Sequence, residues 1–361
     1  MSRIQRRRDL CGTGILHQKN INKNGERYKK NRQEDETYVL NYTGSSARKM
    51  MRAGVMTIPV VVHVVHKQPI ENISDAQIYS QIEILNKDFR KLNSDAINIP
   101  DIWKSVAADT RIEFKLACID PNGDKTNGIT RTATNIDEFL IDTTPNVEEI
   151  KSTALGGKDP WDTTRYLNLW ACNLGTSLLG YAQFPAGDPQ TDGVACNHWV
   201  FGNTGSAVSP QSPFGTRFNL GRTATHEIGH YLDCYHIWGD EWMEDSCSLD
   251  DNVADTPNQK LDSSGVPTFP SFEQACDDTG PNGTMFMNYM DYTDDVGMYM
   301  FTVGQAARMH ATLNGPRASL LQSPVICYND ERRITEAMHL SSKVYDGVNK
   351  IVPVEEKISY V

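Results

Sequence analysis

The chain has 361 residues and a formal net charge of −11 at pH 7, with 39% hydrophobic and 22% charged residues. This composition is typical of a soluble globular protein, and no apolar run approaches the roughly 18 residues that a membrane-spanning helix needs. The acidic balance argues against binding of nucleic acid, which requires a basic surface. The length allows a sizeable core, in one large domain or in two ordinary ones.

The charge is divided unevenly along the chain. Residues 1–54 carry a net charge of +8, whereas the remaining 307 residues carry −19. The first segment is rich in Lys, Arg and Asn and lacks aliphatic periodicity, so its composition is close to that of a flexible arm. The opposite charges predict that this arm contacts either an external anion or the acidic body. Its basic start is not followed by an apolar run, so the sequence shows no secretory signal.

The sequence after the arm has the pattern of a folded domain that contains both strands and helices. The run 55–66 is rich in β-branched residues and predicts a buried strand. Apolar residues recur every three or four positions from Ile78 to Phe89, which predicts an amphipathic helix packed on a sheet, with Ser74 or Asp75 as its cap. Further strands are expected at 111–117, 166–171 and 193–201.

The segment 239–295 differs from the rest of the chain. It is rich in Asp, Asn, Gly, Ser and Pro, and it holds 14 acidic residues against one basic residue, Lys260. An irregular segment of this length in a folded domain needs support, such as a disulfide or bound cations. The chain has eight cysteines, which are scattered without a C-x-x-C pair and are compatible with one or more disulfides.

The stretch 225–236, Thr-His-Glu-Ile-Gly-His-Tyr-Leu-Asp-Cys-Tyr-His, has the pattern of a metal site. On a helix, His226 and His230 lie one turn apart on the same face, close enough to share an ion, and Glu227 lies beside them. A sharp turn after the helix would bring His236 to the same ion, which gives three nitrogen ligands and leaves a fourth position for water. At such a zinc site Glu227 can take a proton from the water and pass it to the leaving amine.

This pattern resembles that of the metzincin zinc endopeptidases, H-E-x-x-H-x-x-G-x-x-H followed by a Met-turn, and among them the pappalysin family with its small ulilysin-type members. The stretch 287–292, Met-Asn-Tyr-Met-Asp-Tyr, matches the Met-turn. The resemblance implies that Met290 lies beneath the zinc and that Tyr292 stabilises the tetrahedral intermediate. The chain departs from the pattern at Asp233, where the family has Gly. A left-handed backbone is expected there, and Asp tolerates it at a cost of about 1 kcal/mol.

The resemblance implies an α+β fold. An upper subdomain, similar to an α/β/α sandwich, would hold a twisted mixed sheet and the zinc-binding helix, and an irregular lower subdomain would follow the third zinc histidine. We expect a basic prosegment at 1–54, a catalytic domain at 55–327 and a C-terminal extension at 328–361. The catalytic domain would divide into the upper part, about 55–232, and the lower part, about 233–327. The extension either forms a small pair of strands or is removed.

Cys11 lies in the arm within the sequence Arg-Asp-Leu-Cys-Gly-Thr. A thiolate is a strong zinc ligand, so Cys11 can occupy the fourth zinc position and exclude the catalytic water until the arm is cut away. The resemblance supports this role, because pappalysin prosegments use an Arg-x-Cys-Gly-like element, although Arg8 stands three residues before Cys11 rather than two. The alternative is an ordinary unpaired cysteine in a disordered arm.

The acidic segment suggests a calcium site. The stretch 250–257 offers the hard oxygen ligands that calcium binds. The resemblance implies that a disulfide between Cys247 and Cys276 clamps the same loop. The side-chain calcium ligands that it implies are Glu241, Asp251 and Thr256. The alternative is an acidic loop that is merely solvated.

Substrate specificity is expected to depend on charge. Asp294 and Asp295 follow the Met-turn, whose wall forms the primed-side pocket in metzincins. A carboxylate at the floor of that pocket selects Lys or Arg in the residue after the cut bond, and in ulilysin-like relatives an Asp corresponding to Asp295 has this role. The alternative is a surface Asp. An enzyme of this specificity would release its own arm at the basic residues before the first strand, Arg48, Lys49 and Arg52.

Other His and Cys residues are assigned structural roles. His63 and His66 lie in the apolar strand 55–66 and are expected to stabilise the fold rather than bind a metal. Cys234 lies inside the zinc pattern but is expected to be a small buried residue, since metal-dependent hydrolysis needs no nucleophilic thiol.

The sequence therefore predicts a latent, secreted or extracellular zinc endopeptidase, activated by removal of its prosegment, that cuts proteins or peptides on the amino side of Lys or Arg. Two alternatives stay open. The first is a broad-specificity metzincin protease in which Asp295 points to solvent. The second is a catalytically silent binding module, whose usual mark is loss of the Glu or of a His, and neither is lost here. The physiological substrate, oligomeric state and export route stay open, as do the partners of Cys118, Cys172, Cys196 and Cys327.

Overall fold

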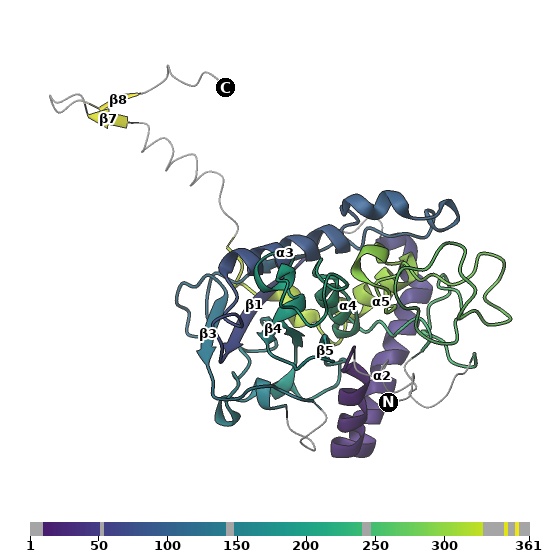
Figure 1. Cartoon of the computed structure of the whole chain (residues 1–361), viewed down its shortest axis with the longest axis horizontal. Helices are drawn as coiled ribbons and strands as arrows, with labels where there is room; N and C mark the ends of the chain where they lie inside the picture. Colours follow the sequence, from purple (N-terminus) through teal and green to yellow (C-terminus); the bar gives the residue numbers. More distant parts are fainter. Residues whose placement is uncertain are drawn as a thin grey trace.

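Six strands form a twisted sheet in the described part of the chain, and all but one of them run parallel (Figure 1). The computed structural model describes residues 10–50, 54–141, 148–239, 247–327, 343–345 and 351–353. The central strand is β1, Met56–His66. It pairs with β2 (Ile112–Leu116) and β3 (Ile129–Ala133) along one side and with β4 (Leu167–Cys172) along the other.

The sheet ends at a short antiparallel edge strand. Strand β6, Val194–Asn197, pairs in parallel with β4, and β5, Gly180–Ala182, pairs with β6 in the antiparallel sense. The other side of β5 accepts the N-terminal arm, because Cys11 forms an isolated bridge with Gly180. The edge strand therefore positions the arm against the body of the protein.

Two helices cover one face of the sheet. Helix α3, Asp75–Phe89, begins after Ser74, whose side chain accepts a hydrogen bond from the backbone N–H of Gln77, as a helix cap requires. Helix α4, Arg222–Tyr231, is buried along its entire length. Such complete burial is unusual for a helix that carries Arg, His and Glu side chains, and it indicates that these polar groups have partners inside the protein.

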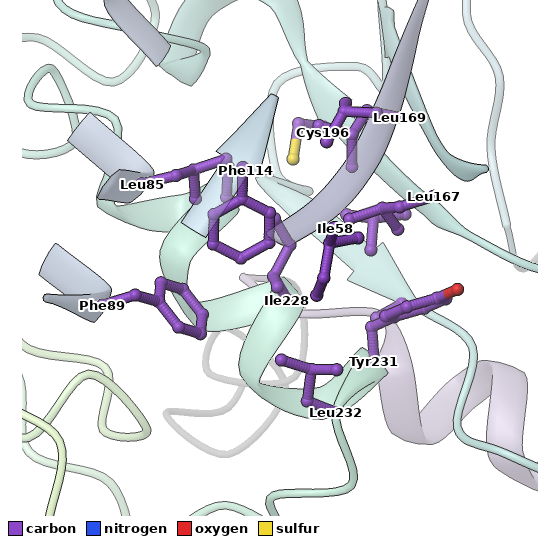
Figure 2. Packing of buried hydrophobic residues seen from close by; sticks show 14 of the residues in the cluster. Ile58, Leu85, Phe89, Phe114, Leu167, Leu169, Cys196, Ile228, Tyr231 and Leu232 are labelled. Atoms are coloured by element: carbon purple, nitrogen blue, oxygen red, sulfur yellow. The ribbon is translucent and has the colours of Figure 1, made fainter. Parts of the chain in front are cut away.

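The main core lies between this face of the sheet and the two helices (Figure 2). Alternate residues of β1 point into it, as expected for a strand with a two-residue side-chain period. The opposite face of the sheet packs against Leu16 of the arm and against Phe139, Ile141 and Ile150 of the connecting segments. The members of the main core that Figure 2 labels are Ile58, Leu85, Phe89, Phe114, Leu167, Leu169, Cys196, Ile228, Tyr231 and Leu232.

The described residues between α4 and α5, Val303–Asn314, form mostly turns and irregular structure. A short 3-10 helix, η8, occupies Asp295–Gly297 just before it. Helix α5 begins with a capping box, in which the Thr302 side chain accepts from the N–H of Gln305 and the Gln305 side chain accepts from the N–H of Thr302. This rigid start of α5 supports the preceding turn at 287–292.

Two disulfides join distant parts of the chain. The pair Cys247–Cys276 lies within the acidic segment and confirms the pairing that the resemblance implies. The pair Cys118–Cys327 joins residues 209 positions apart and could not be assigned from the sequence. The described cysteines outside these pairs are all buried, namely Cys11, Cys172, Cys196 and Cys234.

The N-terminal arm is helical, so the expectation of a flexible arm is wrong. Helix α2, Thr13–Met50, runs beside α5 and is interrupted at Gly25, whose φ of 49° and ψ of −128° are not helical (Figure 1). Leu16, Tyr28 and Val39 are buried against the body. A helix with a weak apolar stripe is stabilised by such tertiary contacts rather than by its own sequence, which explains why the composition suggested disorder.

The predicted strands are largely confirmed. The expected segments 55–66, 111–117 and 166–171 correspond to β1, β2 and β4. The segment 193–201 is a strand only as far as Asn197, after which residues 198–200 form a 3-10 helix. Strands β3 and β5 were not predicted, because β3 has few apolar residues, none of them fully buried, and the three residues of β5 are too few to show an alternating pattern.

In the C-terminal extension, strands β7, Lys343–Tyr345, and β8, Ile351–Pro353, pair with each other in the antiparallel sense. This agrees with the expectation of a small pair of strands. Removal of the extension stays a prediction. Within the described residues, no helix combines the length and the apolar character needed to cross a membrane.

Candidate active site

Helix α4 and the turn that follows it bring three histidines together. His226 and His230 lie one turn apart on α4, and the chain reverses after Leu232 to place His236 beside them. Asp233 makes this reversal in the left-handed conformation that the sequence predicted, with a φ of 72°. The Nε2 atoms of the three imidazoles lie 3.0 to 3.2 Å from one another, and all three side chains are buried.

The protonation of these histidines suits a metal ion. Nδ1 of His226 lies 2.7 Å from the carbonyl oxygen of Tyr289, and Nδ1 of His230 lies 2.8 Å from that of Cys234. Carbonyl oxygens only accept, so each Nδ1 donates and each Nε2 carries a lone pair. Burial lowers the pKa of His226 to about 3, and burial likewise lowers that of His236 to about 3, so both are neutral at pH 7.

The Nε2 lone pairs of His226 and His230 face each other beside Nε2 of His236, and a cation between the three nitrogens would relieve their repulsion. In a tetrahedral zinc site with Zn–N bonds of about 2.0 to 2.1 Å, neighbouring nitrogens are separated by roughly 3.3 Å. The observed separations of 3.0 to 3.2 Å are close to this value. The donor set therefore fits zinc.

The arm supplies a fourth donor to the same place. The Sγ atom of Cys11 and one nitrogen from each histidine all lie within 4.8 Å of one another, and Cys11 is buried. Two backbone hydrogen bonds hold the arm along β5: the N–H of Gly12 donates to the oxygen of Gly180 at 2.8 Å, and the N–H of Leu179 donates to the oxygen of Leu10 at 3.0 Å. These bonds fix the thiol at the three histidines.

Glu227 is buried between the histidines and the arm. Its Oε2 accepts a hydrogen bond of 2.9 Å from the Thr13 hydroxyl and lies 3.5 Å from the Sγ of Cys11. The Thr13 oxygen in turn accepts from the backbone N–H of Ala182 in β5, at 2.9 Å. The arm thus lies against both the three histidines and the carboxylate. Thr13 was not predicted as a site residue, since a threonine in a basic segment carries no signal of its own.

The Met-turn lies directly beneath α4. The Sδ atom of Met290 is so close to Gly229 that a Cβ at this glycine would lie 2.3 Å from it, so the helix accepts no larger residue there without movement. Asn288 and Gln305 exchange two side-chain amide hydrogen bonds of 2.9 Å, which fix the turn to the start of α5. The requirement for Gly229 comes from this close approach and not from its backbone conformation.

Aromatic rings surround the third histidine. The ring of Trp238 stacks on His236 at a centroid distance of 4.4 Å, and that of Tyr292 packs edge-on to it at 5.0 Å. The ring of Tyr292 also lies 5.7 Å from that of His226, so the sequence-predicted tyrosine is at the site. Trp238 was not predicted, because a tryptophan after the motif is more often a core residue.

Asp295 lies at the floor of a pocket beside the histidines. A cavity of about 30 Å³ is lined by this carboxylate, by His226 and Glu227, and by Leu10 and Cys11 of the arm. The Oδ2 atom of Asp295 accepts the backbone N–H groups of Leu220, at 2.8 Å, and Arg222, at 3.3 Å. Burial raises the pKa of Asp295 to about 7.

The neighbouring Asp294 has a different environment. Its Oδ1 pairs with the guanidinium of Arg217 at the surface, at 2.8 to 2.9 Å. The pocket carboxylate is instead supported by Arg222, whose buried guanidinium donates to the backbone oxygen of Asp295 at 2.9 Å. Arg222 was not predicted, since its role depends on a contact with a residue 73 positions away.

Comparisons with known proteins agree with this geometry. The family model described as pregnancy-associated plasma protein-A matches residues 152–314. An extracellular metalloprotease from Arthroderma benhamiae is 30% identical over 264 residues, which cover 71% of this chain and 72% of the relative. The chain belongs to the pappalysin family.

Solved structures support the same assignment. Mature mirolysin from Tannerella forsythia in complex with a cleaved peptide is 49% identical, with a TM-score of 0.68 over 74% of this chain and 96% of that structure. A glutamate-to-alanine mutant of promirolysin from Tannerella forsythia is 43% identical, with a TM-score of 0.73 over 87% of this chain and 97% of that structure. This pappalysin is therefore a zinc metalloendopeptidase with the α+β metzincin fold.

The predicted calcium ligands are only partly within the described residues. Asp251 is buried and accepts hydrogen bonds from the Thr256 hydroxyl, at 2.8 and 2.9 Å to its two oxygens, and from the N–H of Val253. Glu241 lies outside the described residues, as does Arg8 of the arm. Calcium binding stays a prediction.

His63 and Cys234, which were assigned structural roles, are both buried. Both ring nitrogens of His63 are engaged inside the sheet, Nδ1 with the hydroxyl of Thr130 at 2.7 Å and Nε2 with the side-chain oxygen of Asn168 at 2.9 Å. Burial lowers the pKa of His63 to about 4, so it is neutral at pH 7. Cys234 is buried, as expected.

Proposed function

We propose that this pappalysin is a latent, secreted endopeptidase that cuts on the amino side of Lys or Arg and becomes active when its N-terminal arm is removed. The observation that carries the proposal is the convergence of Cys11, His226, His230 and His236 beside Glu227. The extracellular metalloproteases to which the chain is similar support secretion.

His226, His230 and His236 would hold the zinc ion. When bound, zinc would supply a water molecule with a pKa near 7 and a Lewis acid for the scissile carbonyl. Glu227, freed from Thr13, would accept the proton of that water and return it to the leaving nitrogen. Tyr292, whose ring borders His226 and His236, would donate a hydrogen bond to the developing oxyanion.

Latency is assigned to the arm. The Cys11 thiolate would fill the ligand position that the catalytic water needs. The Thr13 hydroxyl would hold Glu227, the general base, in a hydrogen bond. The arm would therefore block both the water position on the metal and the general base. The proposed organisation is a prosegment at 1–54, a catalytic domain at 55–327 and a removable extension at 328–361.

Specificity is assigned to the buried carboxylate of Asp295. A Lys or Arg side chain that enters the pocket from the residue after the cut bond would form a charge-assisted hydrogen bond with it. A calcium ion held by Glu241, Asp251 and Thr256 would support the irregular segment that carries the Met-turn. Protein or peptide substrates with a basic residue at the cut are the expected partners.

The proposal is tested by mapping what the protein cuts. Purified full-length chain is incubated with a denatured protein, with and without added calcium, and the new N-termini are identified by mass spectrometry. We expect most products to begin with Lys or Arg, and we expect a zinc chelator to abolish cleavage until zinc is restored. Products that begin with mixed residues would contradict the specificity, and cleavage that persists without zinc would contradict the mechanism.

The preference for basic residues is expected to depend on pH. Because burial raises the pKa of Asp295 to about 7, the carboxylate is ionised above this pH and neutral below it, whereas Lys and Arg stay charged throughout. The ratio of kcat/KM for a peptide with Arg after the cut bond to that for the same peptide with citrulline should rise as pH increases through about 7. The ionisation of the catalytic groups affects both peptides equally, so the ratio reports the ionisation of the Asp295 carboxylate. A ratio that is constant between pH 5 and 9 would contradict the assignment.

A further inference from the structure

The part of α2 beyond Gly25 makes a second set of polar contacts with the body, separate from those at the histidines. Arg32 and Glu36 are four residues apart and therefore project from the same face of the helix. Nη1 of Arg32 lies 2.7 Å from Oδ1 of Asp233, and Nη2 donates to the Tyr235 hydroxyl at 2.7 Å. The Arg32 side chain is 8% exposed and that of Asp233 is fully buried.

Aromatic rings enclose the guanidinium of Arg32. Its carbon lies 4.9 Å from the ring centre of Phe184 and 5.8 Å from that of Tyr235, within the range of cation–π interactions. The Phe184 ring also packs against His230, with the centroids 5.5 Å apart. The arginine pocket therefore shares a wall with the zinc site but uses none of its ligands.

Glu36 is held by a residue of α5. Arg308 donates from Nη1 and Nη2 to the two oxygens of Glu36, at 2.9 and 2.7 Å, in a bidentate pair. The Tyr235 hydroxyl donates to the same carboxylate at 3.2 Å, so this tyrosine accepts from Arg32 and donates to Glu36. Nε of Arg308 donates to the backbone oxygen of Asp233 at 3.0 Å.

These contacts form two ion pairs of opposite polarity between α2 and the body. The helix supplies one cation and one anion, and the body supplies one anion, Asp233, and one cation, Arg308. Each ion pair is buried or nearly so, with Arg308 only 1% exposed. Without the arm, the carboxylate of Asp233 and the guanidinium of Arg308 have only a looser contact with each other, 3.6 Å between Oδ2 and Nη2. The arm therefore supplies the closer partner of each buried charge, which favours the intact complex. We call Asp233, Tyr235 and Arg308 the charge clamp.

We propose that the charge clamp is a binding site for the arm that works independently of Cys11, so that the arm stays bound to the catalytic domain after the chain is cut. The inference rests on the proposed function only in treating α2 as the removable prosegment. In this proposal Asp233 has a second role, which is to bind Arg32. A glycine at this position of the zinc pattern would provide no carboxylate for that arginine. The cut would be necessary but insufficient for activity, and loss of the arm would be a separate step.

Other contacts of the same half of α2 agree with this site. The Tyr38 hydroxyl donates to the backbone oxygen of Asn314 at 3.0 Å, and Val39 is fully buried. Gly25, at the kink, has no atoms near the position that a Cβ would take. The arm thus has one part that carries Cys11 and another that carries Arg32 and Glu36, which contact the charge clamp, and the two parts meet at an uncrowded kink.

The test measures binding and needs no catalysis. Full-length, zinc-loaded protein that carries Glu227→Gln, which prevents self-cleavage, receives a recognition sequence for an added protease at residues 51–54. After one cut, gel filtration and mass spectrometry follow the release of the arm. We expect the cut arm to elute with the catalytic domain, and also when Cys11→Ser removes the thiol.

Variants of the arm identify the site. Arg32→Ala and Glu36→Ala should each speed release at least about tenfold. Lys30→Ala removes an exposed cation that pairs with Glu34 of the same helix, so it is the matched control and should leave release unchanged. Glu36→Arg and Arg308→Glu should each weaken retention, and the two together should restore it.

Several outcomes would overturn the inference. These are release of the unmodified arm as soon as the chain is cut, release caused by Cys11→Ser alone, or retention that is unaffected by Arg32→Ala and Glu36→Ala. Because the readout is association, none of these results bears on hydrolysis. Conversely, a failure of the proposed activity would leave the binding result intact.

Discussion

Replacement of Glu227 by Gln is expected to lower kcat/KM for peptide hydrolysis by roughly a thousandfold, within the 10²- to 10⁴-fold range that general acid–base groups contribute. Gln keeps the size of the side chain and can still accept from the Thr13 hydroxyl, which in the native chain lies 2.9 Å from Oε2. It cannot take a proton from water at neutral pH. The loss would therefore be chemical, with little change in fold or in substrate binding.

The measurement uses enzyme whose arm has been cut by an added protease and then separated from it, since the variant cannot process itself. Zinc content is determined in parallel, because Glu227 is next to His226 and a loss of metal would mimic a loss of base. Glu71→Gln is a suitable control: Glu71 is also buried, and its Oε2 accepts the backbone N–H groups of Lys67 and Gln68 away from the histidines. A Glu227→Gln enzyme that binds zinc and hydrolyses peptides normally would disprove the assignment.

The zinc site could be predicted because most of its geometry is local. Helical spacing alone places His226 and His230 on one face, and only the turn to His236 requires a special backbone. Asp tolerates the left-handed conformation that this turn needs, and Asp233 adopts it. The Met-turn followed from its short sequence, whereas its support by Gln305 and the close approach to Gly229 depend on packing between segments.

The arm shows the limit of sequence reasoning. Its composition suggested disorder, because the stabilising partners of its charged residues lie far away in the sequence: Arg32 pairs with Asp233 and Glu36 with Arg308. No local pattern in residues 13–50 encodes those partners. The same reason explains why the pair Cys118–Cys327 and the edge strand β5 were not predicted, since each exists only through contacts that the fold creates.

Buried carboxylates have different partners at the two proposed binding sites, the charge clamp and the Asp295 pocket. At the charge clamp, each carboxylate, the buried one of Asp233 and the half-buried one of Glu36, has a buried guanidinium beside it. In the Asp295 pocket, the carboxylate accepts two backbone N–H groups, and the nearby guanidinium of Arg222 donates to its backbone oxygen. A carboxylate held in this way still gains from a cation supplied by a ligand, which is the property that a specificity pocket needs.

Replacement of Asp295 by Asn is therefore expected to remove the preference for Lys and Arg. A hydrogen bond to a charged partner is worth about 1.5 to 3 kcal/mol, so kcat/KM for peptides with Lys or Arg after the cut bond should fall by roughly 10- to 150-fold. Peptides with a neutral residue there should be affected much less. The amide oxygen of Asn can still accept from the backbone N–H groups of Leu220 and Arg222, which keeps the pocket in place.

The matched control is Asp294→Asn, one position earlier in the chain. Asp294 pairs with Arg217 at the surface and does not line the pocket, so its loss should leave specificity unchanged. The two variants have the same charge and the same composition, and both are compared by mapping the products of one denatured protein. If both lose the preference equally, the effect comes from overall charge. If neither loses it, Asp295 does not contact the substrate and the enzyme's selectivity has another source.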